Sequence, residues 1–258
     1  MATYKKRGYK AKEVKIDQTD DVDFNEQDST TAEVFNTLDE SANKTEEWVS
    51  KNQNYILGVI GAIALGVLGY LAYEQFVAKP KEVNAGNDMF YAMQQYNQAL
   101  QSPVAQDSLY NLALHGVNGK YGLIDVIDNY SGSANANLAT YAAGMSYLNT
   151  QKYQEAIDYL SDYKANDAMT GAIANGGIGD AFMQLNQAGE ALEYYEKAVA
   201  ASTNAYTTPM FLQKAAVTAM ELNKNDVALK YFQRIKEEFA KSPEAALVDA
   251  YIAMAKNK

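Results

Sequence analysis

The sequence has no cysteine and one histidine, His115, among its 258 residues. Disulfide bonds and thiolate metal sites are therefore excluded. A histidine within a Leu-Ala-Leu-His segment is more typical of a structural residue than of a general base. The glycine cluster Gly176, Gly177 and Gly179 is not preceded by a predicted strand, and the Lys-Ser or Lys-Thr of a phosphate-binding loop does not follow it. We therefore predict a protein that is not an enzyme and has no catalytic residues, cofactor or metal.

Charge is missing from one long interval. No Lys, Arg, Asp, Glu or His occurs between Lys51 and Glu74, and Ile, Leu, Val, Ala and Gly dominate these 22 residues. As a helix they reach roughly 33 Å, enough for a hydrocarbon core about 30 Å thick. A buried helix of a soluble protein is the alternative, but an apolar surface around the whole circumference favours a membrane span. The run starts too far from the N-terminus for a cleavable signal, so we expect a retained signal anchor.

The apolar run divides the chain into four expected segments. These are a disordered tail at 1–29, an amphipathic juxtamembrane helix at 30–51, a transmembrane helix at 52–77 and a soluble helical domain at 78–258. The tail is basic in its first fifteen residues and acidic after them. Its basic part is either a solvated segment that fixes topology or a contact for anionic lipid headgroups or ribosomal RNA. The net charge of −10 disfavours nucleic-acid binding by the whole protein.

Lysine and arginine predict the orientation. The residues that flank the run closely do not decide it, because Lys44 and Lys51 on one side are balanced by Lys79 and Lys81 on the other. The short N-terminal tail as a whole is rich in Lys and Arg, and short tails follow the positive-inside rule. We expect a cytoplasmic N-terminus and a C-terminal domain across the membrane. Trp48, just outside the run, is predicted to anchor the chain at the membrane interface.

Small residues recur inside the predicted span. Gly58, Ala62 and Gly66 are spaced four apart, and Gly69 lies close to the same face. Such a stripe lets another transmembrane helix approach closely, so we predict a packing face here. The alternative is an incidental stripe, because glycine is frequent in transmembrane helices generally.

The domain after Pro80 is predicted to be all helix, because apolar residues recur at helical spacing between short polar breaks. The expected helices lie near 86–101, 106–116, 120–130, 136–149, 153–164, 171–186, 188–201, 208–222, 225–240 and 243–256. A pattern of small and large residues repeats after 35 residues and again, more weakly, further on. Its copies are Gly144, Tyr147, Tyr153, Ala156 and Leu160, then Gly179, Phe182, Ala188, Ala191 and Tyr195, then Ala216, Ala219, Ala228, Phe232 and Ile235. We expect small residues such as Gly144 and Ala156 to meet between antiparallel helices.

The second copy, GDAFMQLNQAGEALEYYEKA from Gly179 to Ala198, resembles the tetratricopeptide repeat. This predicts an all-α solenoid of helical hairpins plus one transmembrane helix. The chain from about Thr45 onward also resembles the YfgM family of ancillary SecYEG translocon subunits. The motifs are Glu47-Trp48 before the anchor and the closing segment FAKSPEAA that begins at Phe239. The long basic-then-acidic tail departs from that family's pattern.

The YfgM resemblance implies a single-pass protein of the bacterial inner membrane with its repeat domain in the periplasm. It implies partners in the SecYEG translocon and in a PpiD-type periplasmic chaperone, with emerging polypeptides as a further binding class. A membrane-anchored scaffold that organises cell-wall or outer-membrane assembly machinery is the alternative function. A membrane-tethered enzyme is disfavoured, because no nucleophile, base or metal set is evident.

In tetratricopeptide domains, the inner face of each repeat's first helix lines a concave groove. An apolar, methionine-rich groove suits varied apolar clients. None of its predicted positions carries the Lys or Asn that clamps a peptide's terminal carboxylate. The alternative is ordinary core, covered by the C-terminal helix or another chain. The predicted groove residues are Leu138, Tyr141, Met145, Leu148, Ile173, Met183, Met210, Val217 and Met220.

Overall fold

The computed structural model describes residues 30–102 and 106–256, in which every regular element is a helix. The prediction of an all-α solenoid is confirmed. The chain divides into a unit that ends at Leu68 and a unit that begins at Gly69, and each is described by itself. The predicted tail, 1–29, lies outside the described residues.

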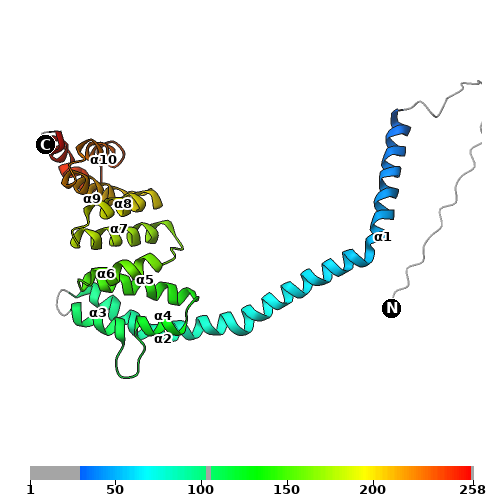
Figure 1. The fold of residues 1–258 in the computed structure, drawn as a ribbon, viewed down its shortest axis with the longest axis horizontal. Coiled ribbons are helices and arrows are strands. Elements are labelled where there is room, and N and C mark those ends of the chain that lie inside the picture. The colour runs from blue at the N-terminus through cyan, green and yellow to red at the C-terminus, as the bar shows by residue number, and fades with distance from the viewer. Residues whose placement is uncertain (1–29, 103–105, 257–258) are drawn as a thin grey trace, which may run out of the picture. The chain divides into compact units, whose positions relative to one another are not determined.

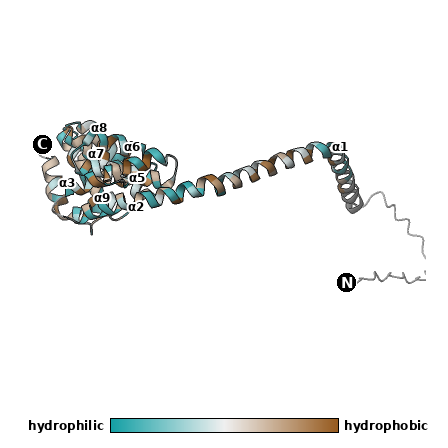
Figure 2. Ribbon diagram, turned by 90° about the horizontal axis from the view of Figure 1, so that it is seen from below, coloured by the Kyte–Doolittle hydropathy of each residue, from teal (hydrophilic) through white to brown (hydrophobic). Residues whose placement is uncertain are grey.

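Helix α1 (Thr30–Tyr73) contains the predicted juxtamembrane segment, the whole apolar run and most of the predicted transmembrane helix at 52–77. The two segments are parts of one uninterrupted α-helix, which a π-helical turn (Glu74–Ala78) follows. Within the described residues, one helical stretch, Ala42–Gln101, includes a part long and apolar enough to cross a membrane, and that part has no buried residues. Figure 2 shows hydrophobic residues along it.

The remaining helices form the repeat domain, and their bounds agree closely with the predicted ones. The largest differences are at α2, which begins before the predicted 86, and at the C-terminus, where a 3₁₀ turn (Pro243–Leu247) precedes the last helix. The helices are α2 (Lys79–Gln101), α3 (Gln106–His115), α4 (Leu123–Asn129), α5 (Ala134–Asn149), α6 (Tyr153–Asp162), α7 (Ala168–Gln184), α8 (Ala188–Ala201), α9 (Thr207–Glu221), α10 (Asn225–Glu238) and α11 (Val248–Lys256).

The hairpins α5–α6, α7–α8 and α9–α10 stack in chain order (Figure 1). Each helix packs on the next one, and the first helix of each hairpin also contacts the first helix of the following hairpin. This nearest-neighbour arrangement is the one that defines a solenoid. At one end of the stack α2 packs on α3, α4 and α5, and at the other end α11 packs on α10.

The turn inside each hairpin has the same geometry, which shows that the weak third copy is a true repeat. Gln151, Asn186 and Asn223 each adopt a positive φ, of 61°, 59° and 58°. The following residue donates its backbone N–H to a carbonyl five positions earlier in every case, as in the bond of 2.9 Å from Lys152 to Tyr147. Such a left-handed residue with a 6→1 hydrogen bond ends a helix in a Schellman motif.

Glycine allows the two helices of a hairpin to approach closely. A Cβ atom added to Gly144 would lie 2.6 Å from Cγ of Leu160, and one added to Gly179 would lie 2.6 Å from Cε1 of Tyr195. The recurrent glycine of the first helix therefore admits a large side chain of the second helix. Leu160, one turn after Ala156, thus supplies the atoms that lie nearest to a Cβ atom at Gly144.

Candidate protein-binding groove

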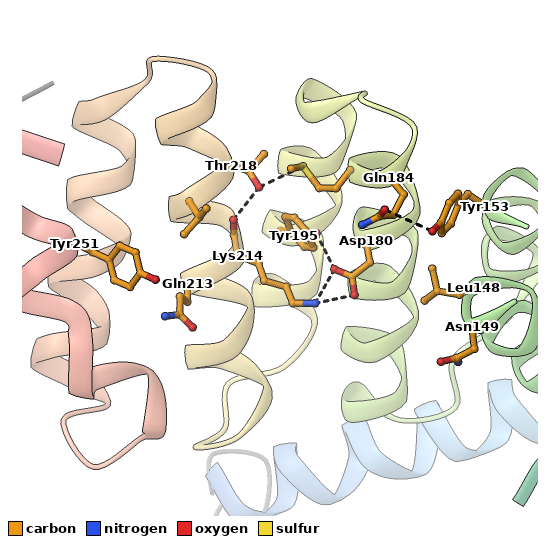
Figure 3. Close-up of a pocket in the computed structure, with 12 residues that line it drawn as sticks. Leu148, Asn149, Tyr153, Asp180, Gln184, Tyr195, Gln213, Lys214, Thr218 and Tyr251 are labelled. Carbon is orange, nitrogen blue, oxygen red and sulfur yellow. Dashed lines mark hydrogen bonds and ion pairs between the residues drawn. The ribbon is translucent and has the colours of Figure 1, made fainter. Parts of the chain in front are cut away.

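An open groove of about 690 Å³ lies across α5, α7 and α9, the first helices of successive hairpins (Figure 3). Tyrosines from α6, α8 and α11 complete its walls. The lining residues are Leu148, Asn149, Tyr153, Asp180, Met183, Gln184, Tyr195, Gln213, Lys214, Val217, Thr218 and Tyr251. The groove belongs wholly to the repeat domain.

The lining combines apolar and amide side chains, and each of α5, α7 and α9 supplies one of each kind. Leu148, Met183 and Val217 supply the apolar part. The amides Asn149, Gln184 and Gln213 lie beside them on the same helices. A carboxamide can both donate and accept hydrogen bonds, as a peptide group does. The groove can therefore receive an extended chain segment with apolar side chains without requiring a charge on it.

An ion pair joins α7 to α9 on the groove floor. The Lys214 Nζ lies 2.6 Å from Oδ1 and 2.7 Å from Oδ2 of Asp180. Both side chains are about one-third exposed, at 36% and 35%. Within α7 and α9 they are the only charged residues apart from the terminal Glu221. The pair neutralises the groove and holds two adjacent repeats together.

Tyr195 braces this ion pair from α8. Its hydroxyl donates a hydrogen bond of 2.7 Å to Oδ1 of Asp180. Burial, reinforced by the nearby carboxylate of Asp180, raises the pKa of Tyr195, so its hydroxyl stays a donor. The Lys214 ammonium also lies 5.8 Å from the centroid of the Tyr195 ring, within the range of a cation–π contact. Asp180 and Lys214 are thus held in a fixed geometry.

Exchanging the two charges tests this brace. Asp180→Lys alone and Lys214→Asp alone are each expected to lower the unfolding free energy by about 1 kcal/mol, because like charges then face each other in a partly solvated site. The double exchange should recover most of that loss, though not all of it, since Tyr195 loses its acceptor. Thermal unfolding of the full chain in detergent, followed by circular dichroism, measures the cycle. Strictly additive losses would show that the pair contributes no coupling.

The structure distributes the predicted groove residues over several environments. Leu148, Met183 and Val217 line the groove. Tyr141 and Met145 pack against one hydrophobic cluster, and Met210 packs against a second. Ile173 is half-buried, and Leu138 is exposed but does not line the groove. Met220 is 7% exposed and belongs to the core, so its side chain is not available to a partner.

Asp180, Lys214 and Asn149 are groove residues that the sequence reasoning missed. They also correct the expectation of a groove without Lys or Asn. That expectation considered only the predicted apolar positions, whereas charged and amide residues lie beside them. The Lys214 ammonium is already paired with Asp180, and the Asn149 amide donates a hydrogen bond of 2.7 Å to the Met145 carbonyl. Both side chains therefore have partners within the protein, unlike side chains that are free to bind a peptide's terminal carboxylate. A signal was present, since α7 and α9 each carry a single internal charge, of opposite sign.

The predicted membrane residues lie on α1. Trp48 is 61% exposed. A Cβ atom added to Gly58, Gly66 or Gly69 would meet no atom within 4 Å, and Ala62 is exposed. The interface anchor and the packing face therefore stay predictions. Among the described residues, no group of three or more His, Cys, Asp or Glu side chains could hold a metal ion.

Comparison with known families matches residues 172–204 to the tetratricopeptide repeat. The matched region covers most of α7 and all of α8, which carry Asp180 and Tyr195. Repeats of this class are generally protein-binding scaffolds that present extended concave surfaces. The chain is thus an all-α solenoid that contains a tetratricopeptide repeat. No curated protein and no solved structure matches it.

Proposed function

We propose that the protein is a membrane-anchored, non-catalytic ancillary subunit of the Sec translocon. In this proposal the groove across α5, α7 and α9 binds the translocon, a PpiD-type chaperone or emerging polypeptides. The observation that carries the binding role is the groove itself, with an apolar side chain from each of its three helices and its internal charges paired. The translocon assignment is supported by the resemblance of the chain to the YfgM family.

The anchor in this proposal is the predicted span at 52–77, which comprises the apolar part of α1 and most of the π-helical turn after it. A cytoplasmic tail at 1–29 and a juxtamembrane segment at 30–51 precede it. The domain at 78–258 then lies in the periplasm, on the side away from the basic tail. Anchoring raises the local concentration of the groove at the membrane, where a polypeptide leaves the translocon. Gly58, Ala62, Gly66 and Gly69 would serve as a contact for a translocon helix in the membrane.

Groove chemistry determines which clients fit. An unfolded segment that leaves the translocon exposes apolar side chains and unpaired peptide groups. Leu148, Met183 and Val217 offer apolar contacts, and Gln184 and Gln213 offer donors and acceptors to the backbone. Because backbone groups are common to all sequences, this lining favours broad binding over recognition of one motif.

Site-specific photocrosslinking in native membranes tests both parts of the proposal. A photoreactive amino acid at Val217 or Gln184 should capture SecY, a PpiD-type chaperone or a translocating chain, and the same probe at exposed Gln233 on α10 should not. Capture of cell-wall or outer-membrane assembly proteins without translocon components would support the alternative scaffold function. No adduct specific to the groove positions would contradict a binding role for the groove.

A further inference from the structure

Helix α2 has an exposed face without charge, which is unusual in a chain of net charge −10. The only charged residue between Val83 and Gln101 is Asp88, and its carboxylate accepts a hydrogen bond from the Tyr130 hydroxyl. Three large apolar side chains are nevertheless open on this helix, with Val83 at 62% exposure, Phe90 at 71% and Leu100 at 54%. The other exposed positions along this face are mainly Asn and Gln.

The exposed residues follow a seven-residue spacing. Val83, Phe90 and Asn97 are seven apart, and Asn87 and Gln94 each come four residues after the first two. Seven-residue spacing with alternating steps of four and three is the spacing of a seam between two parallel supercoiled helices. The opposite face of α2, which includes Ala85, Ala92 and Ala99, is buried in the repeat domain. The face that carries Val83, Asn87, Phe90, Gln94 and Asn97, which we call the seam, is left open.

This seam is complementary to itself. Two acidic chains repel each other, so close contact between copies favours a face that carries no charge. A carboxamide both donates and accepts, so an Asn or Gln can pair with the same residue of a second copy, which a carboxylate or an ammonium cannot do. A hollow of about 360 Å³ adjoins Phe90 and is lined by Met93, Gln94 and Asn97 among others, and it can receive a large apolar side chain.

We propose that α2 pairs with α2 of a second copy of this chain in a parallel, in-register dimer. The direction rests on the membrane anchoring of the proposed function, since two copies anchored through the same helix present α2 in the same sense. Phe90 of each copy packs into the hollow of the other. Asn97 faces its counterpart and favours the in-register alignment, as a polar residue in a seam does.

The absence of cysteine provides a direct experiment on the full chain in its membrane. Single variants Val83→Cys and Asn97→Cys should each form a disulfide-linked dimer on mild oxidation, because the paired Cα atoms fall within the roughly 4.4–6.8 Å that a disulfide requires. Asn84→Cys, one residue off the seam and outside the hollow, and Gln233→Cys on α10 are the matched controls. Equal cross-linking at Asn84 or Gln233, no dimer at Asn97, or an adduct with a different protein at Asn97 would overturn the proposal.

A second variant probes the apolar part of the seam. Phe90→Glu, combined with Asn97→Cys, should lower the disulfide yield at least about tenfold, because an apolar contact is lost and two carboxylates face each other. Gln233→Glu in the same background should leave the yield unchanged. Phe90 is exposed, so the helix content measured by circular dichroism should stay constant, and an unchanged yield in a folded Phe90→Glu chain would overturn the proposal. Groove capture at Val217 is scored separately, so failure of the dimer and failure of the groove are distinguishable.

Discussion

Replacing Gly176 by valine is expected to lower the unfolding free energy of the repeat domain by about 3 kcal/mol. A Cβ atom at this position would lie 1.9 Å from Cε1 and 2.2 Å from Cζ of Phe211, which is 2% exposed. A helix cannot accept such an overlap without moving its neighbour, so α7 and α9 must separate. Because these two helices form the groove floor, the variant should also weaken the pairing of Asp180 with Lys214. Urea unfolding of the full chain in detergent, followed by circular dichroism, measures the loss.

A second-site change tests the assigned cause. Phe211→Leu removes the ring atoms that Gly176→Val would strike, so the double variant should be more stable than the sum of the single losses predicts. Gly189→Ala on α8 is the matched control, because a Cβ atom there meets nothing within 4 Å. That control should be neutral or stabilising, since alanine favours a helix more than glycine does. Additive losses in the double variant would contradict the steric explanation.

The helical repeats could be predicted closely because their determinants are local. Apolar periodicity located the helices, and the small-to-large pattern from Gly144 to Leu160 recurred visibly from Gly179 to Tyr195. The third hairpin was harder to align because its turn residue, Asn223, follows Asn186 by a longer interval than the one that separates Asn186 from Gln151. The third copy was recognisable at this longer interval but weak, because Ala216 occupies the position of Gly144 and Gly179, and because the left-handed turn accepts either Gln or Asn.

The groove was less predictable because it depends on contacts between repeats. Periodicity identifies the inner face of a first helix, yet it cannot tell a residue that reaches the next hairpin from one that lies open. Met220 and Leu148 occupy corresponding positions, but Met220 is buried and Leu148 lines the groove. The pairing of Asp180 with Lys214 links residues on two different hairpins. The two residues do not occupy corresponding positions of their hairpins, because the interval between them differs from the hairpin interval. The repeat pattern in the sequence therefore did not predict their contact.

Two carboxylates placed in the groove are expected to lower client capture at least about tenfold. The variant is Val217→Glu combined with Gln184→Glu, and both residues are exposed lining residues of the groove. An apolar segment that enters the groove would have to desolvate the new charges, which costs several kcal/mol, because Lys214, the cation among the lining residues, is already paired with Asp180. The assay is cross-linking of translocating chains to a photoreactive residue at Gln213, compared between the variant and the unaltered groove.

The matched control is Ala200→Glu combined with Gln233→Glu, which adds the same charge at exposed positions of α8 and α10. Neither residue lines the groove, so capture should stay at the level of the parent chain. Both variants should keep the parent's unfolding free energy within about 1 kcal/mol, because exposed substitutions rarely cost more. Equal capture by the two variants would show that clients bind elsewhere on the protein. Loss of capture in the groove variant alone would tie client binding to the lining that α5, α7 and α9 build together, because charge and stability change alike in the two chains.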